Sequence, residues 1–113
     1  MSSRAMASSM FAGVITLSLQ TSALAYTGNE FLEVCEQDSA RQHCISYVAG
    51  LTHAINSSVF RDAGYVYCIP PEARASQHFD LITKFLEDNP TTRHLGLLTV
   101  ALYAFSKGWP CND

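Results

Sequence analysis

The chain of 113 residues has room for a single domain, and its charge argues against an anionic partner. Ten Asp and Glu residues outnumber seven Lys and Arg, which gives a net charge of −3 with histidine neutral. Nucleic acids and anionic membrane surfaces attract basic proteins, so neither is an expected partner.

Residues 1–25 have the features of a secretory signal peptide in the usual order. A positive charge at Arg4 precedes an apolar run over residues 10–19, and a small-residue end follows at residues 23–25. A membrane-spanning helix needs about 20 apolar residues, and polar residues interrupt this run too early. We therefore expect cleavage after Ala25, with a retained anchor as the alternative, and one exported domain over residues 26–113.

Capping signals mark the starts of the first two expected helices. Thr27 and Glu30 fit a capping box, which predicts a short helix over residues 28–37. The same signal at residues 39–42 opens a longer helix that ends near Phe60. Apolar residues recur in it at helical spacing: Cys44, Val48, Leu51, Ile55 and Val59, widened by Tyr47 and Ala54.

A connecting loop is expected over residues 61–72, which lack a helical period and contain one glycine and two prolines. Helical spacing resumes at Ala73 and stops at Asn89, because the next residue is a proline.

A last helix, capped by Thr91 or Thr92, ends at Gly108 and Pro110. Its apolar stripe is Leu95, Leu98, Ala101, Leu102 and Phe105. The chain thus predicts an all-α fold, a small bundle of about four helices.

All four cysteines lie beyond the leader: Cys35, Cys44, Cys68 and Cys111. An even number in a short exported chain indicates two disulfides, for which three pairings are possible. If Cys35 closes the first helix and Cys44 opens the next across a tight turn, their Cα atoms approach the roughly 5.5–6 Å that a disulfide needs. Local geometry therefore favours this pair, which leaves Cys68 for Cys111.

Catalytic and metal-binding patterns are missing from the sequence. The histidines lie far apart, without ligand spacing: His43, His53, His78 and His94. There is no close Cys pair for zinc, no nucleophile elbow and no glycine-rich phosphate loop. We therefore expect no enzyme activity, no metal and no cofactor.

Five segments, taken in order, resemble the Rap/Tai immunity family. They are Tyr-Thr-Gly-Asn-Glu-Phe-Leu-Glu-Val-Cys at 26–35, Cys-Ile-Ser-Tyr-Val-Ala-Gly at 44–50, Cys-Ile-Pro at 68–70, residues 77–94 and Trp-Pro-Cys at 109–111. The chain departs from the family pattern where Ser46 replaces a glycine, His78 an apolar residue, and Gly96-Leu97 a Pro-Ala pair.

This resemblance implies an all-helical periplasmic protein that binds and blocks a peptidoglycan amidase toxin delivered by type VI secretion. The expected mechanism is occlusion of the toxin's active site. A periplasmic stress or chaperone-like helical protein without a dedicated toxin is the alternative, and a homodimer is compatible with the sequence.

Arg61, Tyr65 and Tyr67 are the candidate partner-binding residues, because they lie in the expected loop. Tyr and Arg are enriched among the residues that contribute most to interfaces. The competing interpretation is that Tyr65 and Tyr67 only cover the disulfide of Cys68.

Protein expressed from the whole sequence and isolated from the periplasm should begin at Tyr26. Its intact mass should lie about 4 Da below the fully reduced value, since each of two disulfides removes two hydrogens. A chain that begins at Met1, or thiols that react with an alkylating reagent under denaturing conditions, would contradict this prediction.

Overall fold

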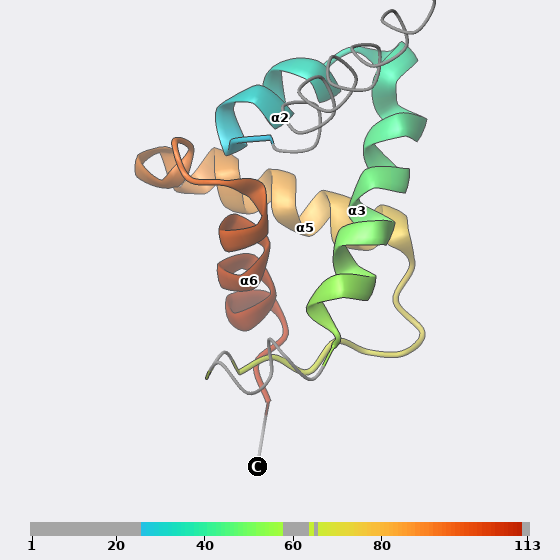
Figure 1. The fold of residues 1–113 in the computed structure, drawn as a ribbon, viewed down its shortest axis with the longest axis vertical. Helices are drawn as coiled ribbons and strands as arrows, with labels where there is room; N and C mark the ends of the chain where they lie inside the picture. The colour runs from blue at the N-terminus through green and yellow to red at the C-terminus, as the bar shows by residue number, and fades with distance from the viewer. Residues whose placement is uncertain (1–25, 58–63, 65, 112–113) are drawn as a thin grey trace, which may run out of the picture.

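A computed structural model describes residues 26–57, 64 and 66–111, and these ranges are mainly helical (Figure 1). Their α-helices are α2 (Gly28–Cys35), α3 (Arg41–Ile55), α5 (Ala75–Asp88) and α6 (Leu97–Gly108). Two 3-10 turns, η2 (Asp38–Ala40) and η3 (Pro90–Thr92), precede α3 and α6. The described ranges contain one isolated β-bridge, between Thr27 and Gly96, and no strand. The predicted all-α class is confirmed.

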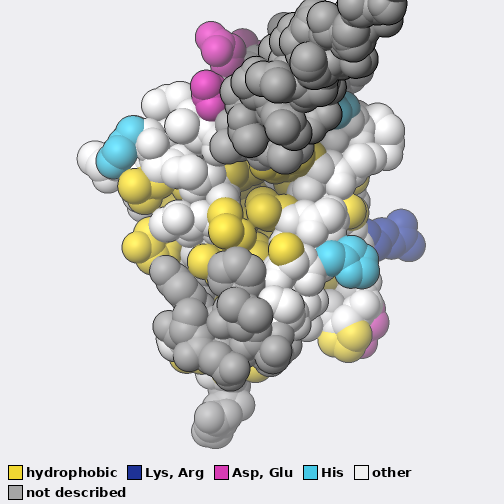
Figure 2. All heavy atoms as spheres, viewed as in Figure 1, with side chains coloured by type: hydrophobic (Ala, Val, Ile, Leu, Met, Phe, Trp, Pro, Cys, Tyr) yellow, Lys and Arg dark blue, Asp and Glu magenta, His cyan; other side chains and the backbone are white. Residues whose placement is uncertain are grey.

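The helix α5 is the centre of the arrangement. It packs against both α3 and α6, and α2 contacts all three of these helices. Figure 1 shows α3 and α6 on opposite sides of the view, with α5 running across between them and α2 across one end. On the face seen in Figure 2, hydrophobic side chains gather in the middle and charged side chains lie near the rim.

The core is built from the apolar stripes of these four helices. Phe31 of α2 is fully buried, and its ring centroid lies 5.9 Å from that of Phe79 on α5. From α6, Phe105 is also fully buried. Complete burial of an aromatic or large aliphatic side chain contributes about 1.5–3 kcal/mol, so these contacts hold the short helices together.

Backbone hydrogen bonds join the start of the domain to the connection between α5 and α6. We call this contact the N-terminal clasp (residues 26–29 with 93–97). Three backbone hydrogen bonds cross it: Gly28 N–H to Leu95 O at 3.0 Å, Asn29 N–H to Arg93 O at 2.8 Å and Leu97 N–H to Tyr26 O at 2.8 Å. The Arg93 side chain in turn donates to the carbonyl of Leu86, at 2.7 Å from Nε. Carbonyls at a helix end lack partners within the helix, so Arg93 also caps α5.

Both predicted disulfides are confirmed. Cys35 is bonded to Cys44, with Cα atoms 6.1 Å apart, and links the end of α2 to the first turn of α3. Cys68 is bonded to Cys111, with Cα atoms 5.0 Å apart. The Cys68 N–H also donates to the carbonyl of Trp109 at 2.8 Å, so the segment before α5 is joined to the end of α6.

The capping box of Thr27 and Glu30 is present, with Glu30 N–H donating to Thr27 Oγ1 at 3.1 Å and Thr27 N–H to Glu30 Oε1 at 2.9 Å. The second predicted box is wrong. The turn η2 occupies residues 38–40, and Ala40 precedes α3 without a side-chain cap. The first two helices also end earlier than predicted, at Cys35 and Ile55.

The start of the last helix was also predicted wrongly, because the threonines before it serve a different turn. Thr92 Oγ1 donates to the carbonyl of Asn89 at 2.7 Å and stabilises η3, so α6 begins only at Leu97. The buried face shifts accordingly: Leu97 is 1% exposed, whereas Leu98, predicted in the core, is 36% exposed. At α5, the start lies two residues beyond the predicted Ala73.

Gly28 is expected to tolerate no side chain. A Cβ there would lie 3.0 Å from the backbone oxygen of Arg93 and 2.5 Å from a methyl carbon of Leu86. We expect Gly28→Ala to lower the free energy of unfolding by about 1–3 kcal/mol, as overpacking does.

The matched control is Gly50→Ala in the exposed part of α3, where a Cβ would have no atom within 4 Å. This variant should gain about 0.5–1 kcal/mol, because alanine favours a helix over glycine. Urea unfolding of both variants measures the difference. Equal stability of Gly28→Ala and the unchanged protein would show that the clasp is not tightly packed.

Candidate functional site

The structure describes one of the three predicted contact residues. Arg61 and Tyr65 lie outside the described residues. Tyr67 is 3% exposed, and its hydroxyl donates to the carbonyl of Ile55 at the end of α3. A side chain in this position is inaccessible to a partner, so we do not retain Tyr67 as a contact residue.

The neighbours of Tyr67 in sequence face solvent. Val66 is 62% exposed, which is the largest exposure among the large hydrophobic residues of the described ranges. Gly64 has a φ of 96°, in the left-handed region that favours glycine. The segment that enters the core at Tyr67 therefore leaves an apolar side chain on the surface beside it.

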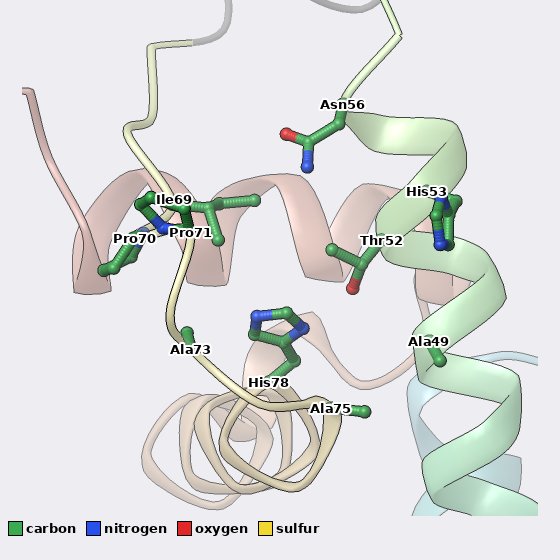
Figure 3. A pocket seen from close by; sticks show the side chains of 10 residues that line it. All are labelled: Ala49, Thr52, His53, Asn56, Ile69, Pro70, Pro71, Ala73, Ala75 and His78. Atoms are coloured by element: carbon green, nitrogen blue, oxygen red, sulfur yellow. The ribbon is translucent and has the colours of Figure 1, made fainter.

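A cavity of about 280 Å³ opens close to this segment, between α3, the chain before α5, and the first turn of α5 (Figure 3). We call it the His78 pocket. Its lining residues are Ala49, Thr52, His53, Asn56, Ile69, Pro70, Pro71, Ala73, Ala75 and His78. Figure 3 shows the His78 ring rising from α5 into the space between Thr52 and Ile69.

His78 is buried with its hydrogen-bonding capacity unused. The residue is 8% exposed, and neither ring nitrogen has a hydrogen-bond partner among the described residues. Aromatic rings surround its other side, with centroids 5.7 Å away at Phe105 and 5.4 Å away at Trp109. Leaving a buried donor or acceptor unpaired costs about 1–3 kcal/mol.

Burial also decides the charge of this imidazole. Desolvation lowers the pKa of His78 below its ordinary value of 6.5, because the charged form loses its hydration. At neutral pH the ring is therefore uncharged and presents one N–H donor and one acceptor nitrogen.

The remaining pocket wall is mostly apolar and carries no formal charge. Its lining includes no Asp, Glu, Lys or Arg. Thr52 Oγ1 donates to the carbonyl of Val48 at 2.8 Å, which leaves its oxygen lone pairs free to accept from a ligand. In Figure 3 this oxygen points down toward His78, and the Asn56 amide reaches in from the end of α3.

Reactive groups are scarce around this pocket. All four cysteines are in disulfides, so none is a free thiol. Among the residues that the structure describes, no three His, Cys, Asp or Glu side chains gather as metal ligands. In the same ranges, no helix combines the length and apolar character needed to cross a membrane.

The described residues thus define a class, a small disulfide-linked helical domain with one mostly apolar pocket beside His78. A model of the Rap1a immunity proteins matches residues 27–111, and the chain belongs to this family. The match confirms the resemblance found in the sequence. Membership of this family indicates a function in immunity, with a toxin protein as the partner. Searches of curated proteins and of solved structures gave no significant match.

The lowered pKa of His78 makes stability depend on pH with a definite sign. The unfolded chain binds a proton near its ordinary pKa of 6.5 and the folded chain only at lower pH, so acid favours unfolding. The stabilisation is present above this value and is lost as the pH falls toward the folded pKa.

Urea unfolding between about pH 7.5 and pH 5.5 should show this loss, up to about 1.4 kcal/mol per pH unit. The His78→Phe variant should lack it. His53, the other titratable residue of the pocket wall, is present in both proteins and cancels in the difference. Identical pH dependence in both proteins would mean that His78 keeps its ordinary pKa.

Proposed function

We propose that this protein is a periplasmic immunity protein that inhibits a peptidoglycan amidase toxin by covering the toxin's active site. The family match over residues 27–111 is the observation that carries the proposal. An immunity protein acts by binding its toxin, and a small helical domain held by two disulfides is compatible with that role.

Two features support a periplasmic location. Disulfides form and persist in oxidising compartments, and both pairs of cysteines are bonded. Residues 1–25, which lie outside the described residues, have the sequence features of a signal peptide. A cell wall amidase acts in the same compartment, so inhibitor and toxin would meet there.

The contact surface that we propose lies around the chain between α3 and Cys68. Its C-terminal end is fixed by Tyr67 in the core and by the disulfide of Cys68 with Cys111. An anchored segment loses less conformational entropy on binding than a free one. Arg61 and Tyr65 are the proposed contacts, and the exposed Val66 adds apolar surface beside them.

The test first asks whether a peptidoglycan amidase is encoded beside the gene of this protein. That amidase is then purified and mixed with protein isolated from the periplasm. We expect the protein to inhibit peptidoglycan cleavage in a one-to-one manner. Replacing both Arg61 and Tyr65 by alanine should weaken binding at least tenfold, equivalent to about 1.4 kcal/mol. The melting temperature of the double variant is measured as the control for folding, and we expect it to stay at the value of the unchanged protein.

The control is Lys84→Ala on the exposed side of α5. Lys84 forms a surface ion pair with Asp88 at 3.1 Å, and exposed pairs contribute little. This variant should inhibit as well as the unchanged protein. Absence of inhibition, together with binding to many unrelated unfolded proteins, would contradict the proposal and favour a chaperone-like role. Full inhibition by the double variant would place the contact surface elsewhere.

A further inference from the structure

The position of His78 in the folded domain does not suit a positive charge. Both ring nitrogens are closed to solvent and have no hydrogen-bond partner among the described residues. A neutral imidazole carries one N–H donor, whereas the protonated ring carries two, and each of them needs an acceptor or water. A buried charge without either is far more costly than a buried neutral group. Protonation therefore requires the ring to move.

The described surroundings of the ring offer it no counter-charge. From α3, the one titratable residue that lines the pocket is His53, which is exposed. From α6, the ring meets the side chains of Phe105 and Trp109. The chain before α5 carries Glu72 and Arg74, which are both exposed and lie outside the pocket wall, and no other ionisable residue of α5 lines it. Burial alone is the cause of the lowered pKa of the imidazole.

The pocket beside the ring gives a charged imidazole a place to go. It has a volume of about 280 Å³ and lies between α3 and the first turn of α5 (Figure 3). Trp109 is not among its lining residues, so a ring that turns into this space leaves Trp109. Water and the side-chain oxygens of Thr52 and Asn56 can accept there from the two N–H groups. The displaced ring thus exchanges an apolar environment for a hydrated one.

The ring also supports the contact between the chain before α5 and the end of α6. Its centroid lies 5.4 Å from that of Trp109, whose carbonyl accepts from the Cys68 N–H at 2.8 Å. Phe105 completes the group, with its centroid 5.7 Å from those of both other rings. Aromatic contacts at such distances are favourable beyond the area that they bury. Loss of the His78 ring therefore weakens the position of Trp109, and with it the hydrogen bond to Cys68.

We propose that acid turns His78 out of its place beside Trp109 and opens the hydrogen bond between Cys68 and Trp109, as a reversible pH switch at this end of the domain. The disulfide of Cys68 with Cys111 keeps the two segments linked, so the opening is local. The N-terminal clasp does not involve His78 and stays closed. Val66 of the proposed contact surface lies two residues before Cys68, so toxin binding would also become pH-dependent if the proposed function holds.

Trp109 is the single tryptophan of the chain, so its fluorescence reports directly on this contact. Protein expressed from the whole sequence and purified from the periplasm is titrated from about pH 7.5 to about pH 4. We expect the emission to move to longer wavelength with a midpoint below the ordinary histidine pKa of 6.5, because the open state binds the extra proton. The helical circular dichroism signal should persist. In NMR spectra the amide signal of Cys68 should change with the same midpoint, while that of Gly28 in the clasp keeps its position.

The matched variant is His78→Phe, because a phenyl ring keeps the aromatic contact with Trp109 and binds no proton. Both transitions should be absent in it. The smaller side chain of His78→Leu serves the same purpose if His78→Phe does not fold. His53→Gln removes the other titratable residue of the described pocket wall and should leave both transitions unchanged.

Three results would overturn the switch. A constant emission wavelength in the folded protein would show that acid leaves the contact between Cys68 and Trp109 closed. A coincident loss of the circular dichroism signal and of the native Gly28 signal would mean that the whole domain unfolds at once. Transitions that persist in the His78 variants, or vanish in His53→Gln, would assign the response to another group.

Discussion

The backbone contact between residues 26–29 and 93–97 is the constraint on which the described fold depends. The helix α2 has 8 residues, and isolated helices shorter than about 12–15 residues are marginal in water. Three hydrogen bonds and the close approach at Gly28 hold this short helix against α5 and α6, and thereby enclose Phe31. A signal peptide cleaved after Ala25 would leave this contact complete, since Tyr26 is its first member.

The opposite end of the domain is fixed by the disulfide of Cys68 with Cys111. There the core closes on Tyr67, and His78 remains buried without a partner. The free energy of unfolding of such domains is about 5–15 kcal/mol. An unsatisfied imidazole that costs about 1–3 kcal/mol therefore removes a considerable share of the stability. Sites that bind partners often retain such groups at the expense of stability.

Side-chain patterns predicted the helices and the disulfides, because these features depend on local spacing. The boundaries were less predictable: Thr92 could cap a helix or a 3-10 turn, and only its bond to Asn89 O decides between them. The clasp consists of backbone hydrogen bonds between distant segments and so has no side-chain pattern. The burial of His78 depends on the packing of Phe105 and Trp109 around it, which the sequence does not display.

The most direct measurement of the proposed immunity function is the growth of bacteria that produce the proposed amidase toxin in their periplasm. Cells that also express the whole sequence should grow normally, because the exported protein meets the toxin in the same compartment. Cells that express the chain without residues 1–25 should lyse, since that chain stays in the cytoplasm. Lysis in the presence of the whole exported chain would contradict the immunity function, and equal protection by both chains would contradict action in the periplasm.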